Sequence, residues 1–175
     1  MGVIQKIIAN HKEKVKARND MCDNLIMQID AALLEITILF SDLQSFVEPG
    51  KESEWNNRNA SLMTNAASAN IQKLRKAAHY KKLSDKQTEL YRSANSLKQQ
   101  IGIHNNKVAD VKIQNAYALI GDVEGRRLDR QQMICIVKDA HNHLVIAGAG
   151  TGKTTTVVGK IKFLLKSGKY KPEDI

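Results

Sequence analysis

The first part of the chain carries apolar residues in a heptad pattern. One set recurs every seven residues, and a second set follows it three residues later. The sets are Ile8, Val15, Cys22, Ile29, Ile36 and Leu43, then Leu25, Ala32, Leu39 and Phe46. Such a stripe predicts a long amphipathic helix that packs against another helix. His11 and Arg18 hold the second position at the start, so we expect a weaker seam there.

The segment 47–57, VEPGKESEWNN, predicts a turn, because it combines Pro49 and Gly50 with polar residues. Trp55 is expected at this end of a hairpin. A second helical stretch is predicted over about 60–120, with Gly102 as a possible bend. Its two heptad sets are Leu83, Leu90, Leu97, His104 and Val111, and Gln87, Ala94, Ile101, Val108 and Asn115. An antiparallel, coiled-coil-like α-helical hairpin over 1–120 is predicted, and self-association through the same stripes is the alternative.

The heptad pattern ends at Gly121, which opens a second predicted domain over 121–175. A short helix is predicted around 130–139. The apolar run 144–146 is typical of a buried parallel strand, and 154–167 predicts a helix that stops at Gly168. A strand, a turn and a helix in this order predict the start of an α/β domain.

The turn between this strand and helix fits a phosphate-binding loop in its relaxed form. The loop consists of Ala147, Gly148, Ala149, Gly150, Thr151, Gly152, Lys153 and Thr154. Its glycines let successive backbone N–H groups face inward. Lys153 is expected to reach the β- and γ-phosphates of ATP, Thr154 to ligate Mg²⁺, and Thr155 to lie with the nucleotide-binding residues. With this loop, the segment predicts the start of an α/β P-loop NTPase (RecA-like) domain. A glycine-rich turn without a ligand is the alternative.

The formal net charge of +9 suggests a polyanionic partner such as nucleic acid, although a lysine-rich surface alone has the same effect. Between residues 72 and 112 there are ten Lys or Arg residues and three acidic ones. The densest group is Lys73, Arg75, Lys76, Lys81, Lys82 and Lys86. A basic helical face of this kind is a candidate DNA-binding surface, and a merely solvated face is the alternative.

The two cysteines lie far apart in the sequence and lack metal-ligand spacing. We interpret Cys22 and Cys135 as reduced thiols, which suits a cytoplasmic protein. No stretch approaches the roughly 20 apolar residues of a membrane span.

From Leu128 onward the sequence resembles the start of the motor domain of superfamily 1 DNA helicases of the UvrD/Rep type. The resemblance covers roughly 121–175, and it rests on Leu128, Gln132 and the loop 147–154. It implies that Gln132 hydrogen-bonds the adenine of ATP. It also implies a 3′–5′ helicase that acts on single-stranded DNA.

Family members continue into an acidic motif that holds Mg²⁺ and into a second motor domain that supplies arginines. Hydrolysis needs such groups. We therefore expect the chain to be the N-terminal part of a helicase that is inactive alone, whether through truncation, an interrupted gene or deliberate shortening. The alternative is a non-enzymatic helical module that binds DNA or a protein through residues 1–120. The partner of the predicted hairpin is left open.

Overall fold

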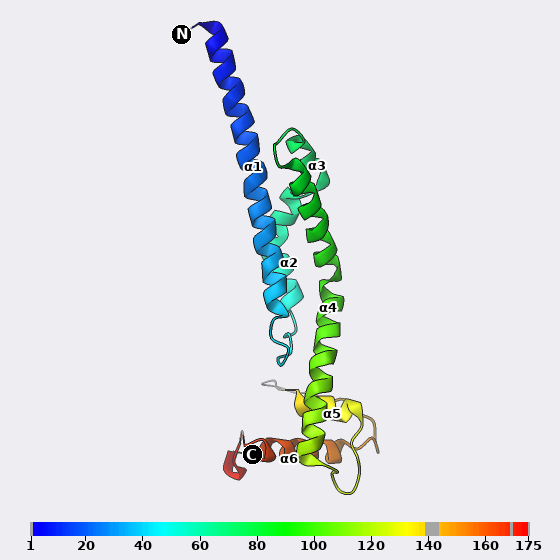
Figure 1. The fold of residues 1–175 in the computed structure, drawn as a ribbon. Helices are drawn as coiled ribbons and strands as arrows, with labels where there is room; N and C mark the ends of the chain where they lie inside the picture. Colours follow the sequence, from blue (N-terminus) through cyan, green and yellow to red (C-terminus); the bar gives the residue numbers. More distant parts are fainter. Residues whose placement is uncertain (1, 139–143, 169, 175) are drawn as a thin grey trace. The chain divides into compact units, whose positions relative to one another are not determined.

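The structure is a computed structural model that describes residues 2–138, 144–168 and 170–174. Every regular element in these ranges is a helix (Figure 1). The chain divides into two compact units, and we describe each one separately. Unit 1 consists of Met1–Asp42 and Val47–Ile101, and unit 2 consists of Leu43–Phe46 and Gly102–Ile175. None of the helices in the described ranges is both long and apolar enough to cross a membrane.

Unit 1 is built on two long helices with shorter helices between them. Helix α1 spans Val3–Leu39, and α4 spans Tyr80–Ile120 with its first half in this unit. The shorter elements are α2 (Lys51–Asn65), α3 (Ser68–Ile71) and the 3-10 helix η1 (Gln72–Leu74). Gly50 precedes α2 with a positive φ of 90°, and acidic residues in the first turn of α2 favour its N-terminus.

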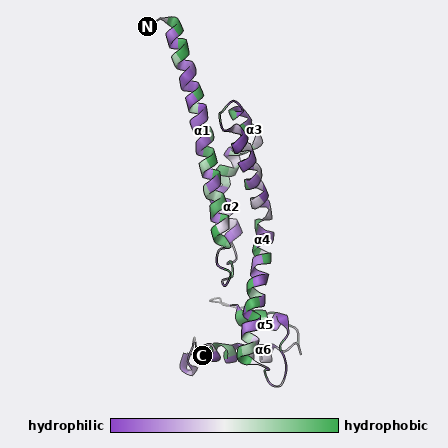
Figure 2. Cartoon of the chain, viewed as in Figure 1, coloured by the Kyte–Doolittle hydropathy of each residue, from purple (hydrophilic) through white to green (hydrophobic). Residues whose placement is uncertain are grey.

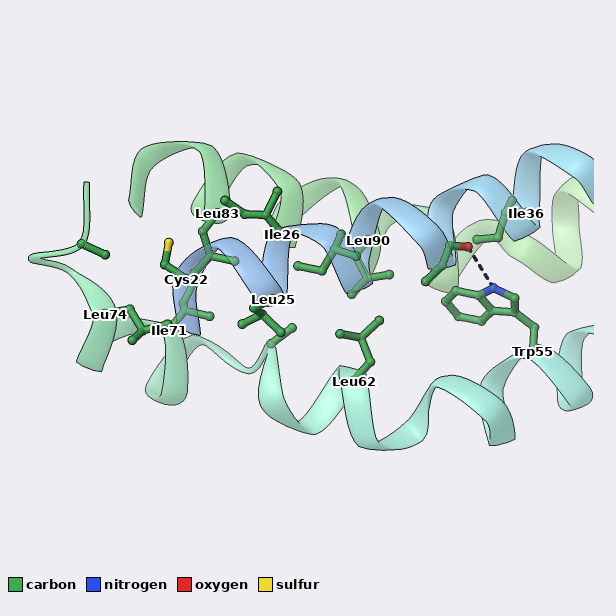
Figure 3. Close-up of a cluster of buried hydrophobic side chains, with 14 of the residues drawn as sticks. Cys22, Leu25, Ile26, Ile36, Trp55, Leu62, Ile71, Leu74, Leu83 and Leu90 are labelled. Atoms are coloured by element: carbon green, nitrogen blue, oxygen red, sulfur yellow. Dashed lines mark hydrogen bonds between the residues drawn. The ribbon is translucent and has the colours of Figure 1, made fainter. Parts of the chain in front are cut away.

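The core of unit 1 lies between α1, α2 and α4 (Figure 3). Leu83 and Leu90 of α4 are fully buried with Ile29 of α1. Trp55 of α2 inserts into this core, and its Nε1 donates a hydrogen bond of 3.2 Å to the carbonyl oxygen of Ala32. The buried indole N–H therefore has a hydrogen-bond acceptor. Apolar burial and this one hydrogen bond together hold α2 against α1.

Three predictions for this unit are wrong in detail. Helix α1 ends at Leu39, and Leu43 beyond it is 72% exposed. The segment after Gly50 forms α2 instead of a long turn, so Trp55 is a core residue with 4% exposure. The second helical stretch is interrupted between Asn65 and Tyr80. The sequence pattern missed α2 because its buried residues, Trp55, Asn59 and Leu62, are few and one is polar.

Unit 2 contains the second half of α4 with α5 (Arg130–Val137), α6 (Lys153–Lys166) and the 3-10 helix η2 (Pro172–Asp174). Its core combines one face of α4 with α5 and the turn between them. The buried residues are Ala109, Ile113, Ala116, Ile120, Val123, Leu128, Met133, Ile136 and Val137. Helix α6 ends as expected before Gly168, which has a φ of 68°. Helix α5 is shorter than the predicted 130–139, and Asp139 lies outside the described residues.

The buried face of α4 changes within unit 2. The predicted heptad positions Val111 and Asn115 are exposed, whereas Ile113 and Ala116 are buried. An α-helix has about 3.6 residues per turn, so a strict seven-residue stripe drifts around it unless the helix supercoils with a partner. Helix α4 is continuous through Gly102, and the predicted heptad positions remain buried as far as His104 and Val108.

The predicted buried strand at 144–146 is not a strand in this structure. Leu144 is 86% exposed and Ile146 is 89% exposed, and neither belongs to a regular element. A strand needs a neighbour that accepts its backbone hydrogen bonds. The described residues offer no second strand beside this segment.

Candidate phosphate-binding site

The predicted phosphate loop ends at the N-terminus of α6. Gly150 and Gly152 have φ values of 76° and 82°, which glycine adopts without strain. Ala147 does not have a positive φ, so alanine is tolerated there. Gly152 is the N-cap residue and Lys153 is the first residue of the helix. The free backbone N–H groups of this turn and the helix dipole together favour an anion.

The side chain of Lys153 bends back across the loop. Its Nζ donates hydrogen bonds to the carbonyl oxygens of Ala147 at 3.1 Å and Gly148 at 2.7 Å. The hydroxyl of Thr151 also donates to Gly148, at 2.9 Å. A phosphate oxygen would be a stronger acceptor for the ammonium group than these neutral carbonyls. The arrangement therefore holds a cation at the loop that can turn towards an anionic ligand.

Gln132, the predicted adenine-binding residue, lies against the loop. It belongs to a capping box at the start of α5, in which its backbone N–H donates to Asp129 and its Oε1 accepts from the Asp129 N–H, both at 2.9 Å. Its Nε2 donates to the carbonyl oxygen of Thr151 at 3.3 Å. A Cβ atom on Gly152 would lie 2.6 Å from this Nε2. The φ of 82° favours glycine at position 152, and a side chain there would also push the Gln132 amide out of its present position.

The turn that precedes α5 also contacts the first turn of α6. Val123 and Arg126 exchange backbone hydrogen bonds of 2.9 and 3.0 Å, and Glu124 between them has a φ of 52°. Positive φ is uncommon for a residue other than glycine. The Glu124 carboxylate accepts a hydrogen bond of 3.2 Å from the Thr155 hydroxyl in the first turn of α6. Glu124 and Gln132 therefore both fix the start of this helix.

The packing of α6 on α5 depends on a small residue. A Cβ atom on Gly159 would lie 2.8 Å from Cδ1 of Ile136 and 2.9 Å from Cδ1 of Leu128. Nearby, Lys160 donates to the carbonyl oxygens of Ile136 at 2.6 Å and Lys138 at 2.9 Å, which places a cation at the C-terminus of α5. These contacts hold α5, which carries Gln132, against α6, which follows the loop.

Sequence reasoning missed several residues that shape this site. The Asp129 and Gln132 pair was readable as a capping box, because an N-cap residue followed three positions later by Gln is its signature. Glu124 followed by Gly125 is a turn signal, but its bond to Thr155 spans 31 residues and leaves no trace in the sequence pattern. Gly159 looks like an ordinary helical glycine until α5 is placed beside it.

The predicted basic face is not one helical face. Lys73 lies in η1, Arg75 and Lys76 lie in the turn that follows, and the other three lysines lie in α4. Lys86 forms ion pairs of 3.0 Å with Asp30 and with Glu89. The hydrogen bonds that Lys86 donates to these two carboxylates raise the pKa of Lys86. It is therefore engaged inside unit 1, whereas the side chains of Arg75, Lys76, Lys81 and Lys82 are exposed.

Comparison with known proteins gives two matches. Residues 128–175 match the family described as the UvrD/REP helicase N-terminal domain. DNA helicase IV of Escherichia coli strain K12 is 33% identical over 72 residues, which are 41% of this chain and 10% of that protein. The C-terminal segment is therefore similar to the start of UvrD-type helicases. The expected resemblance is confirmed there, and no solved structure matches the chain.

The matched segment contains the loop 147–154, Gln132 and helix α6, all of which belong to unit 2. The chain spans about a tenth of the length of the curated relative that it matches. The activity of a whole helicase thus enters only as a proposal.

Proposed function

We propose that the chain is part of an ATP-dependent 3′–5′ DNA helicase and that unit 2 binds the phosphates of MgATP. The observation that carries this proposal is that Lys153 and Gln132 both donate hydrogen bonds to carbonyl oxygens of the loop at the N-terminus of α6. Backbone N–H groups, a helix dipole and a lysine at one point are a suitable environment for a polyphosphate.

Each residue of the site has a proposed role. Lys153 would turn from the loop carbonyls to the β- and γ-phosphates, and Thr154, which is exposed in the first turn of α6, would ligate Mg²⁺. A single hydroxyl suits Mg²⁺, because this ion keeps several waters and takes its other ligands from the phosphates. Gln132 would exchange its bond to Thr151 for the adenine edge. The remaining loop residues and Thr155 would frame the ligand.

Titration of MgATP into the full chain tests this proposal. We expect weak binding that Lys153→Ala abolishes, because the variant lacks the cation that meets the phosphates. Gly102→Ala is the control, since a methyl group there meets no other atom within 4 Å and lies outside the loop. Wild-type chain that binds no MgATP, or a Lys153→Ala variant that binds it equally well, would overturn the proposal.

ATP hydrolysis by these residues alone is not expected. Phosphoryl transfer needs an acidic group for the metal and the water, together with arginines at the γ-phosphate, and the helicase family places these groups in later motifs. We propose that single-stranded DNA is the partner of the intact enzyme and that the location is cytoplasmic. DNA-stimulated hydrolysis that is lost in Lys153→Ala would show the expectation of inactivity to be wrong.

A second candidate function is sequence-independent DNA binding by the helical extension, which we propose to be residues 1–120 and separate from the motor segment 121–175. It is favoured by the exposed basic cluster at the start of α4, which consists of Lys73, Arg75, Lys76, Lys81 and Lys82. Phosphate contacts made by such residues weaken steeply with salt.

A duplex oligonucleotide titrated at several salt concentrations tests this second function. Arg75→Gln with Lys76→Gln should weaken binding and reduce its salt dependence by about two phosphate contacts. Lys86→Gln is the matched control, because its charge is already paired with Asp30 and Glu89. Binding that is absent, or indifferent to salt, excludes this function.

A further inference from the structure

The N-terminal part of α1 is a helix without a neighbour in unit 1. The first contacts that reach α1 from the turn before α4 are the bond from the Ala78 N–H to Asn19, 3.0 Å, and the approach of His79 to Asp23, 2.7 Å. None of the described residues before Cys22 is buried. Figure 1 shows this end of α1 extending beyond α3 and the start of α4. An isolated helix of about 15 residues is only marginally stable in water, so a covering partner would stabilise it.

This part of α1 still carries the heptad seam. We call the following set the N-terminal stripe: Ile4, Ile8, His11 and Val15. Ile4 is 73% exposed and Ile8 is 50% exposed. The stripe continues the buried positions Cys22 and Ile29. Figure 2 shows apolar and polar residues alternating along this helix.

A second apolar stripe lies on α1 outside the core of unit 1. We call the following set the outer stripe: Met27, Ala31, Leu34 and Ile38. Met27 is 69% exposed and Leu34 is 57% exposed. The side of α1 that faces α2 and α4 is instead formed by residues such as Leu25, Ile29 and Ile36, all of which are buried. The outer stripe is therefore free in the isolated unit.

We propose that the outer stripe of one copy of this chain covers the N-terminal stripe of a second copy. Both stripes have steps of four, three and four residues along the helix, so they match in register over their full length. In parallel orientation the opposed pairs are Ile4 with Met27, Ile8 with Ala31, His11 with Leu34, and Val15 with Ile38. Parallel coiled coils pair equivalent heptad positions in this way.

The length of α1 fits this register. Beyond Asn19 the seam is already occupied by the rest of unit 1, so a covering helix has to end before that point. Helix α1 ends at Leu39, one residue after the outer stripe. In the proposed register Leu39 lies opposite Lys16 and therefore stops short of Asn19. An antiparallel helix would continue past Asn19 into the space that α2 and α4 occupy.

Charge also favours this pairing over the contact of two N-terminal stripes. Residues 3–18 contain five basic residues, Lys6, Lys12, Lys14, Lys16 and Arg18, against one acidic residue, Glu13. Two such segments side by side would repel each other. The outer stripe is flanked by Asp30 and Glu35, which already pair with Lys86 and Arg58 of the same unit. The register brings Lys12 of one copy beside Asp30 of the other, whose side chain is still 45% exposed and can accept a second ammonium group. Complementary flanking charges of this kind select coiled-coil partners.

The proposed contact joins two different surfaces, so it is heterologous. Each associated pair leaves one stripe of each kind free, and further copies can add to it.

Sedimentation of the full chain over a range of concentrations tests this self-association. We expect the average mass to rise with concentration, and to rise less at high salt. Ile8→Glu and Leu34→Glu should each be monomeric alone. Met21→Glu, at an exposed apolar position outside both stripes, should associate as the wild type does.

Mixing the two variants is the decisive step. Ile8→Glu keeps an intact outer stripe and Leu34→Glu keeps an intact N-terminal stripe, so an equimolar mixture should form a one-to-one dimer and nothing larger. Circular dichroism checks that both variants remain helical. Wild type that stays monomeric at about 1 mM overturns the proposal. A mixture that stays monomeric also overturns it. A third result also overturns it: an acidic designed heptad peptide saturates the N-terminal stripe while the chain itself does not self-associate. That result would assign the N-terminal stripe to a helix of another protein. None of these results depends on nucleotide binding.

Discussion

At the scale of single residues, glycines decide how the candidate site is built. Gly152 has to accept both a left-handed φ and the amide of Gln132, and Gly159 has to accept two side chains of the neighbouring core. Sequence alone showed the loop glycines, because a phosphate loop has a fixed pattern of glycine positions. It did not show why Gly159 is glycine, since that depends on where α5 packs.

Gly152→Ala should damage the site more than the fold. The new Cβ would lie 2.6 Å from Gln132 Nε2 and would force a strained backbone at a φ of 82°. We expect a loss of about 1–3 kcal/mol in the free energy of unfolding and the loss of MgATP binding. Urea unfolding and nucleotide titration measure the two effects. An unchanged free energy of unfolding together with unchanged MgATP binding would show that Gln132 does not pack closely against Gly152.

Gly159→Ala and Gly102→Ala should have opposite effects on stability. At Gly159 the added methyl group meets Ile136 and Leu128 at under 3 Å, so overpacking should cost about 1–3 kcal/mol. At Gly102, which lies inside α4, it meets nothing within 4 Å, so the better helix propensity of alanine should add about 0.5–1 kcal/mol. Urea unfolding compares the two. The same sign for both would contradict the close contact of α5 and α6.

At the scale of elements, the heptad periodicity of apolar residues predicted the buried positions where a helix packs against the same neighbours along its length. It failed where the neighbouring element changes. The heptad positions of α1 from Cys22 to Ile36 and of α4 from Leu83 to Leu97 are buried together. Helix α2 and the shift of the buried face of α4 were not predictable, because they arise from which segments happen to pack there. The same reason explains the missing strand at 144–146, whose pairing partner is not among the described residues.

Lys86 should join α1 to α4 by charge. Replacing it in Lys86→Met removes the ion pairs with Asp30 of α1 and Glu89, and should lower the free energy of unfolding by about 0.5–1 kcal/mol, because the groups are partly exposed. These bonds raise the pKa of Lys86, so its contribution is present at neutral pH and is lost only as the pH rises through that raised value. The difference between wild type and variant should thus be equal at pH 7 and at about pH 9. A difference that disappears by about pH 9 would contradict this.

At the scale of the whole molecule, the sequence predicts a helical extension followed by a segment that resembles UvrD-type helicases, and the matched residues 128–175 lie within unit 2. Gln132 and Lys153 both contact carbonyl oxygens of the loop there. The extension carries the N-terminal stripe, which continues the predicted heptad seam, and the outer stripe, which the heptad pattern did not single out. Their exposure follows from where α2 and α4 begin and end, which no local pattern reveals.

The most direct test of the central claim is a residue-resolved amide NMR spectrum of the chain, recorded with and without MgATP. The account predicts shifts at the loop residues 148–155 and at the side-chain amide of Gln132, because the phosphates displace Lys153 from the carbonyl oxygens of Ala147 and Gly148. The same spectrum of Lys153→Ala should show none of these shifts. Shifts that fall instead on the basic cluster at Arg75 and Lys76, or an unchanged spectrum, would contradict it.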